Sequence, residues 1–108
     1  MSDAMLLGAD LSGKDLRQSN LSRAILMNAN LAGANLTGAH LSMATLSGAN
    51  LTGANLTGAN LTATNLAGAN LTGANLTDAL MFQIDFNHPF FAGAIFSGAT
   101  MPDGSIHD

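Results

Sequence analysis

Residues 49–58 read Ala-Asn-Leu-Thr-Gly-Ala-Asn-Leu-Thr-Gly, and this five-residue unit continues in both directions through most of the chain. A leucine stands at every fifth position from Leu6 to Leu76, and the same register continues through apolar residues as far as Met101. We call this apolar residue the centre of each unit. Ala usually stands two positions before the centre, Asn one before it, Ser or Thr one after it, and Gly two after it. So strict a period predicts that one small structural unit is repeated along the chain.

Neither an α-helix nor a flat β-strand can use this period. A helix advances about 100° per residue, so centres five apart would step around its surface instead of forming one apolar stripe. Side chains of a flat strand alternate between two faces, so an odd period would turn every second leucine outward. A bend in every unit solves the problem: Ala and Leu point inward, and the chain turns at the glycine, which tolerates the backbone angles of a tight bend. A chain that keeps bending in one sense forms a coil.

Glycine usage indicates how many units make one coil. If the glycine position of every fourth unit is taken as one column, the column that begins at Gly13 contains only glycine: Gly13, Gly33, Gly53, Gly73 and Gly93. Another such column contains no glycine and consists of Arg23, Met43, Ala63, Gln83 and Asp103. A periodicity of 20 residues favours four units per coil, with coils stacked about 4.8 Å apart.

Units such as Ala49-Asn50-Leu51-Thr52-Gly53 and Ala9-Asp10-Leu11-Ser12-Gly13 resemble the A(D/N)LXX repeat of the pentapeptide-repeat proteins. The resemblance covers residues 4–103, and Met101–Ser105 is similar to the ending of some cyanobacterial members. It implies an all-β fold, a right-handed quadrilateral parallel β-helix of about five coils with four repeats each. We expect one β-helix domain over residues 1–103 and a short C-terminal tail over residues 104–108.

Composition excludes several classes of protein. The chain has 108 residues, no cysteine, and only three Lys and Arg side chains against seven acidic ones, for a net charge of −4. It therefore has no disulfide, no cysteine-based zinc site and no basic footprint for nucleic acid. The start is acidic and no apolar run is long enough to span a membrane, so we expect a cytoplasmic protein without membrane contact.

The sequence contains few residues that could carry out catalysis or bind a metal. Asp85 and His88 lie close together, and Asp103 or His107 could complete a metal site, but we expect these side chains on an outward, uncovered surface. Catalysis needs an acid–base pair or nucleophile held within hydrogen-bond reach, and small ligands bind in concave pockets. We therefore predict a protein that is not an enzyme, with no catalytic residue, no cofactor and no bound metal.

The charged residues gather near the two ends, since residues 31–77 contain none. The open ends of a coil stack expose unpaired backbone, so polar terminal coils would act as caps; a functional charged rim is the alternative. Lys14 stands at an inward position and requires either an open first coil or a path to solvent. The regular Asn and Thr columns of the middle are expected to form structural ladders in which Asn side chains bond from coil to coil. A water-ordering Thr array is the other interpretation.

The C-terminal end becomes aromatic, with centres at Phe86, Phe91 and Phe96 and outward apolar residues that include Phe90 and Ile95. Such an apolar cluster indicates a contact surface or a place where the tail folds back. Two interpretations stay open. One is a homodimer through the C-terminal coil, as in several family members; the other is a cap made by residues 102–108.

One side of the predicted stack departs from the repeat and is our candidate for binding an unidentified protein partner. With the C-terminal cluster, it gives the candidate interaction surface Arg23, His40, Met43, Leu80, Phe82, Gln83, Phe90 and Ile95. Neutral drift on a tolerant face is the competing explanation.

We interpret the chain as a non-enzymatic structural or protein–protein interaction module. The alternative function comes from the resemblance, because some family members modulate DNA gyrase or topoisomerase by mimicking duplex DNA. DNA carries one negative charge per about 1.7 Å of its axis, whereas this chain would be a short rod with an uncharged middle.

Overall fold

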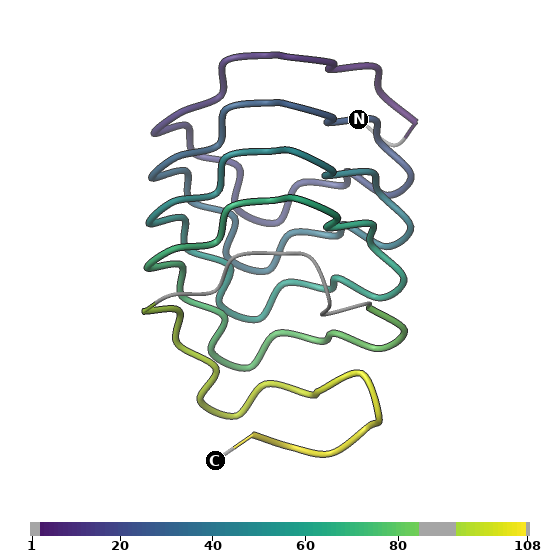
Figure 1. The fold of residues 1–108 in the computed structure, drawn as a ribbon, viewed down its shortest axis with the longest axis vertical. Coiled ribbons are helices and arrows are strands. Elements are labelled where there is room, and N and C mark those ends of the chain that lie inside the picture. Colours follow the sequence, from purple (N-terminus) through teal and green to yellow (C-terminus); the bar gives the residue numbers. More distant parts are fainter. Residues whose placement is uncertain (1–2, 85–92, 108) are drawn as a thin grey trace.

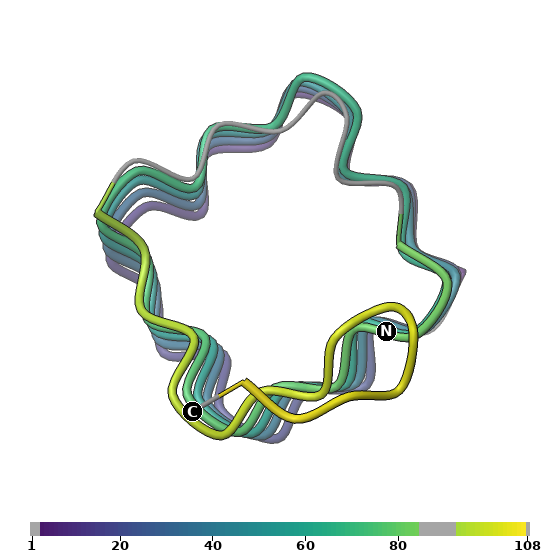
Figure 2. The same ribbon diagram turned by 60° about the horizontal axis from the view of Figure 1, so that its bottom comes forward.

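A computed structural model describes residues 3–84 and 93–107 of the chain, and these residues wind into a stack of coils (Figure 1). Seen close to the stack axis, each coil has a four-sided outline with a bend at every corner (Figure 2). The principal-axis extents are 33 × 25 × 23 Å. Within the described ranges the chain has no helix and no strand longer than an isolated bridge, because the backbone turns again after every few residues. The fold is the predicted right-handed quadrilateral β-helix.

The coil contains 20 residues, as the glycine columns predicted. Each parallel β-bridge joins residues 20 apart, as in the series Asn20, His40, Asn60, Leu80 and Thr100. These bridges always involve the residue before a centre. Its N–H donates to the preceding coil, while the N–H groups of the centre and of the glycine position donate to the following coil. Successive coils are therefore tied together on every side that residues 3–84 and 93–107 form.

The turn at each corner explains the glycine. The N–H of Ala54 donates to the carbonyl oxygen of Leu51 at 3.0 Å, and this bond recurs from unit to unit. The glycine position between them has a positive φ in every described unit from residue 3 to residue 98, with +64° at Gly53 as an example. This left-handed conformation costs an ordinary residue roughly 1–2 kcal/mol but costs glycine almost nothing. Glycine is thus the natural occupant of a bend that must be repeated at every corner.

The core consists of the inward Leu and Ala residues. From Leu21 to Met81 the centres are buried, with exposed fractions of 2% or less. Two inward residues depart from the alanine rule, and both are accommodated. Thr64 is 3% exposed and its hydroxyl donates to the carbonyl oxygen of Leu41 at 2.7 Å, while Ile84 is 5% exposed within the apolar core. Phe86 and Phe91 lie outside the described residues.

The first coil is more open than the middle. Leu6, Leu11 and Leu16 are only partly buried, although they occupy the same inward position as the buried leucines. Lys14, which also stands at an inward position, is exposed. The ammonium group therefore reaches water, as the sequence required.

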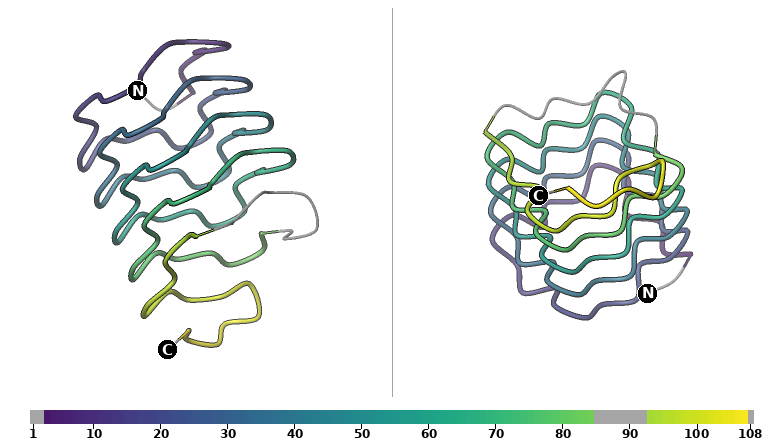
Figure 3. Two further views of the ribbon diagram at one scale, coloured as in Figure 1. Left: turned by 60° about the vertical axis from the view of Figure 1, so that its left-hand side comes forward. Right: turned by 90° about the horizontal axis from the view of Figure 1, so that it is seen from below.

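The C-terminal tail folds back on the last coil (Figure 3). Thr100 and Ile106 form an antiparallel bridge. The N–H of Gly98 donates to the carbonyl oxygen of His107 at 2.7 Å, and the His107 ring lies 5.7 Å from that of Phe96. The structure thus shows the fold-back, and the homodimer through the C-terminal coil stays a prediction. Part of the last coil's edge is paired within the chain.

Candidate functional site

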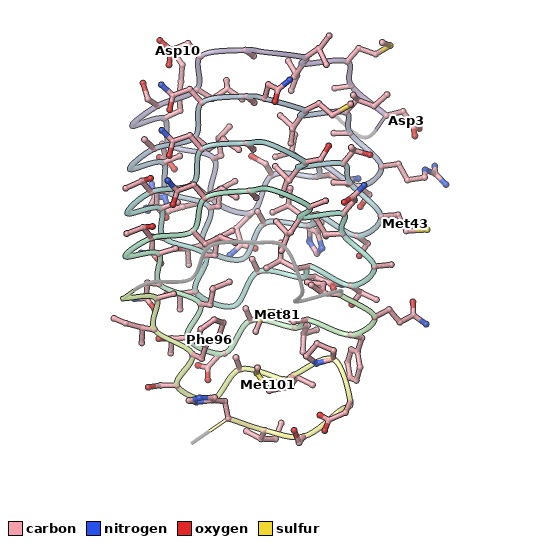
Figure 4. The ribbon with its side chains drawn as sticks, in the orientation of Figure 1. Asp3, Asp10, Met43, Met81, Phe96 and Met101 are labelled. Carbon is pink, nitrogen blue, oxygen red and sulfur yellow. The ribbon has the colours of Figure 1, made fainter. Side chains whose placement is uncertain are left out.

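The predicted irregular side exists as one continuous face of the stack, which we call the variable face. It carries three columns: Asn20, His40, Asn60, Leu80 and Thr100; Ser22, Ser42, Thr62, Phe82 and Pro102; and Arg23, Met43, Ala63, Gln83 and Asp103. All of them are outward positions of the repeat, but Thr100 is buried, with 8% of its surface exposed. The parallel bridges of the first column hold these residues in line. Figure 4 shows Met43 projecting away from the stack on the same side as Asp3, which occupies the corner one coil before Arg23.

The structure brings together six of the eight candidate residues. Arg23, His40, Met43, Leu80, Phe82 and Gln83 lie on the variable face. Ile95 does not, because its bridge to Asn75 places it in the column of the adjacent side. Phe90 lies outside the described residues.

The corner of the variable face is strained. Arg23, Met43, Ala63 and Gln83 all have φ between +58° and +63°, the left-handed region that the neighbouring corners fill mostly with glycine. Each non-glycine residue there costs roughly 1–2 kcal/mol. Clusters of such conformations are typical of functional sites, where a side chain is retained despite the strain. The residues at this corner are therefore not the ones that the turn of the repeat favours, which marks the corner as a candidate functional surface.

The C-terminal half of the variable face carries two exposed apolar side chains beside the polar Gln83 and Asp103. Leu80 and Phe82 are 36% and 40% exposed, and Met43 further up the corner is 57% exposed. Gly104 of the tail lies beside the Phe82 ring, since a Cβ built on Gly104 would be 3.7 Å from a ring carbon. The folded tail thus borders this apolar surface and leaves Phe82 accessible.

Charge lies at the two ends of the stack. In the first coil the Arg17 guanidinium donates to both carboxylate oxygens of Asp15 at 2.8 Å, and this bond lowers the pKa of Asp15 to about 2. Arg23 pairs with Asp3 of the coil above it at 3.0 Å. The Ser12 hydroxyl lowers the pKa of Asp10 through a hydrogen bond of 2.7 Å. The middle, where no side chain is charged, offers no electrostatic attraction for a charged partner.

The Asn and Thr columns proved to be local turn structures. Asn55 Oδ1 accepts bonds from both the N–H and the hydroxyl of Thr57, at 3.1 and 2.7 Å, and the same arrangement recurs at Asn35, Asn50 and Asn75. Asn and Asp commonly bond in this way to the backbone two residues on. We predicted that Asn side chains bond from coil to coil, but the Oδ1 atoms of these residues accept their hydrogen bonds within their own turn.

Sequence reasoning missed a second apolar surface, which we call the N-terminal patch. It consists of Met5, Leu7, Ile25 and Met27 on the side of the stack that follows the variable face. Met5 and Leu7 are 76% and 64% exposed, and Met27 is 37% exposed. The signal was present in the sequence, because these four outward positions are apolar where the repeat has Asn, Ser or Thr.

Two structural features matter for metal binding and for a membrane span: a group of side chains that could hold a metal ion, and a helix that could span a membrane. Across 3–84 and 93–107, no three side chains of the metal-binding types are grouped so that they could hold an ion. Asp85 and His88 of the considered metal site lie outside these ranges. Likewise, none of the described residues belong to a helix long and apolar enough to cross a membrane.

Comparison with known proteins identifies relatives of this fold. The family description "Pentapeptide repeats" matches residues 4–42 and 39–78, in eight copies. A solved structure of alr5209, a pentapeptide repeat protein from Nostoc Pcc 7120, is 42% identical, with a TM-score of 0.77 over 87% of this chain and 81% of that one. A pentapeptide repeat protein from the Arabidopsis thaliana thylakoid lumen is 30% identical, with a TM-score of 0.59 over 91% of this chain and 72% of that one. The search of curated proteins finds no match.

Proposed function

Because the chain belongs to the pentapeptide-repeat family, we propose that it is a non-enzymatic module that binds a protein partner through its variable face. The observation that carries this proposal is the coincidence, on one face, of a strained non-glycine corner with exposed Met43, Leu80 and Phe82. Aromatic residues, methionine and arginine are enriched at protein interfaces, and this face offers all three.

The geometry of the face suits a protein partner better than a small molecule. Its residues stand in straight columns, held by parallel bridges on the outside of a four-sided stack. Small-molecule sites are concave and bury most of the ligand surface. An extended surface with a few apolar anchors is the form that protein interfaces take.

Mimicry of DNA in the binding of gyrase receives no support from the charge distribution. No charged side chain lies between Arg23 and Asp78. A mimic of duplex DNA needs negative charge along its whole axis, at a density near one per 1.7 Å. The homodimer through the C-terminal coil and the cytoplasmic location remain predictions. Such a dimer would have to accommodate the tail that already pairs with Thr100.

The test compares capture of partners from the native cell by three forms of the chain. The first is the wild type, and the second replaces Met43, Leu80 and Phe82 with serine. The third is a matched control that replaces Thr52 and Thr72 with serine on a regular side. We expect the wild type and the control to recover the same protein, and the variable-face variant to lose it. Equal recovery by all three forms would place the interaction elsewhere. Recovery of gyrase, together with inhibition of its supercoiling by the purified chain, would support the alternative function.

A further inference from the structure

The N-terminal patch is a small ordered array on an otherwise polar side of the stack. Met5 bridges to Ile25 directly beneath it, and the N–H of Gly8, next to Leu7, donates to the carbonyl oxygen of Met27 at 2.9 Å. The four apolar side chains therefore form two stacked pairs on two successive coils. One coil further down, the same positions hold Thr45 and Ser47, where the polar repeat resumes.

The patch has a polar rim with one ion pair. At the corner preceding Met5 and Ile25, Arg23 Nε donates to Asp3 Oδ1 at 3.0 Å, and both side chains are about 60% exposed. At the opposite corner stand Gly8 and Asn28. An apolar centre surrounded by polar residues is the usual anatomy of a protein interface. Methionine is the residue that best adapts its shape to an apposed apolar surface.

We propose that the N-terminal patch pairs two copies of this chain side by side, with their stack axes antiparallel. A two-fold axis lying in the plane of contact, between the first and second coils, exchanges the upper and lower rows of the patch. Met5 then faces Ile25 of the second copy, and Leu7 faces Met27 of the second copy. The same operation places Asp3 opposite Arg23 of the second copy. The patch is therefore complementary to itself in both apolar contact and charge, as an isologous interface requires.

Charge is what favours a second copy over an unrelated partner. The two Asp3 and two Arg23 side chains would form an alternating group of four across the interface, in which no like charges face each other. Rotation about an axis parallel to the stack would instead set Arg23 against Asn28, without this complementarity. The antiparallel arrangement overlaps only the first two coils, so the C-terminal half of the variable face, with Leu80 and Phe82, stays open on both copies.

The patch is small for a protein interface. Met5, Leu7 and Met27 are exposed and Ile25 is half-buried, so the four side chains present clearly less than the roughly 800 Å² per partner of an interface of standard size. Contacts below the standard size are typical of weak, reversible encounters, so we expect a dimer that forms only at high protein concentration. The pairing does not depend on the proposed function, and it would give a partner two variable faces to bind.

The decisive test uses two charge variants, Asp3→Arg and Arg23→Asp, measured separately and mixed. Each variant alone sets like charges against each other across the two-fold axis, so sedimentation velocity near 1 mM should show at least a several-fold weaker dimer than the wild type. An equal mixture sets the two basic side chains of one copy against the two acidic side chains of the other. We expect the mixture to dimerise at least as well as the wild type. A wild type that stays monomeric near 1 mM, or a mixture no better than either variant alone, would overturn the proposal.

Thiol cross-linking distinguishes this surface from the C-terminal coil, because the natural chain has no cysteine. Leu7→Cys and Ile95→Cys each introduce a single thiol, at opposite ends of the stack. The natural residues at these positions are 64% and 48% exposed, respectively. A short bismaleimide should link Leu7→Cys into dimers and leave Ile95→Cys monomeric. The reverse result would assign the pairing to the C-terminal end and contradict the proposal. Circular dichroism of each variant verifies that the coils remain folded.

Discussion

Gly48 and Gly68 occupy the same corner column in successive coils, and we predict that alanine is tolerated differently at the two positions. Their φ values are +67° and +68°, so alanine meets the same backbone strain at both. Left-handed backbone costs alanine roughly 1–2 kcal/mol, and the loss of chain freedom in the unfolded state returns about 0.4–1 kcal/mol. Gly68→Ala should therefore lower the free energy of unfolding by about 1 kcal/mol. A Cβ at Gly68 would meet only the Gly48 nitrogen, at an ordinary 3.9 Å.

Gly48→Ala carries an additional steric cost. A Cβ at Gly48 would overlap with Asn28 Oδ1, so the Asn28 side chain must leave its position. Rotating a short side chain out of its preferred rotamer costs about 0.5–1.5 kcal/mol. We therefore expect Gly48→Ala to lose about 2 kcal/mol in total, twice the effect at Gly68.

The assay is urea or thermal unfolding of both variants, alone and with Asn28→Gly. Removing the Asn28 side chain abolishes the contact, so Gly48→Ala should then cost no more than Gly68→Ala. Equal destabilisation of the two single variants, with no rescue by Asn28→Gly, would refute the steric argument. If neither alanine destabilised the protein, the assumption that the left-handed turn strains a non-glycine residue would be wrong.

Three further outcomes follow from the structure. Leu51→Ala creates a cavity in the closed middle of the stack and should cost about 2–5 kcal/mol, whereas Leu11→Ala in the open first coil should cost clearly less in the same unfolding assay. Arg17→Ala removes the side-chain hydrogen bond that lowers the pKa of Asp15. The pKa of Asp15, measured as its titration midpoint by NMR, should therefore rise from about 2 towards 3.8. Because the folded pKa is the lower one, the stabilisation exists above pH 3.8 and is lost as the pH falls towards 2. Removal of residues 102–108 should expose the last coil, lower the melting temperature and increase dye binding to apolar surface, while removal of Asp108 alone should do neither.

The sequence predicted the coil and its core because both depend only on the spacing of residue types along the chain. A period of five fixes which residues point inward, and a periodicity of 20 in glycine fixes which residues stack. The bridge from Asn30 to Asn50 and the burial of Leu51 follow from these two numbers. Even the exposure of Lys14 could be anticipated, because a charged group at an inward position needs access to water.

Other features depend on local geometry that periodicity does not contain. Asn55 lies in a ladder as expected, but its oxygen bonds to Thr57 because the turn brings that N–H and hydroxyl within reach. The fold-back at Thr100 and Ile106 could be stated from the sequence only as one of two alternatives. The N-terminal patch is not marked by a missing glycine: Met5 and Leu7 depart from the repeat at the Asn and Ser/Thr positions, on a side whose corner keeps Gly8, Gly48 and Gly68.

Inward and outward residues of each unit have different roles, and this explains why departures from the repeat at outward positions point to function. Stability comes from inward Leu and Ala and from backbone bonds between coils, whereas the Asn and Thr bonds stay within one turn. An outward side chain is therefore not required by the coils above and below it. Met43 illustrates the point, since it is 57% exposed and adopts a φ of +59° that glycine would adopt without strain.

Met43→Gly should accordingly stabilise the protein. Relief of roughly 1–2 kcal/mol of strain exceeds the 0.4–1 kcal/mol that glycine loses through the greater freedom of the unfolded chain, for a net gain of about 0.5–1 kcal/mol. Ala63→Gly, in the next coil of the same corner, serves as a matched control that removes almost no side-chain surface. If Met43→Gly destabilised the protein while Ala63→Gly stabilised it, the Met43 side chain would belong to the packing of the fold. If both stabilise it, the strain at this corner serves something outside the fold, and loss of partner capture by Met43→Gly would identify that as binding.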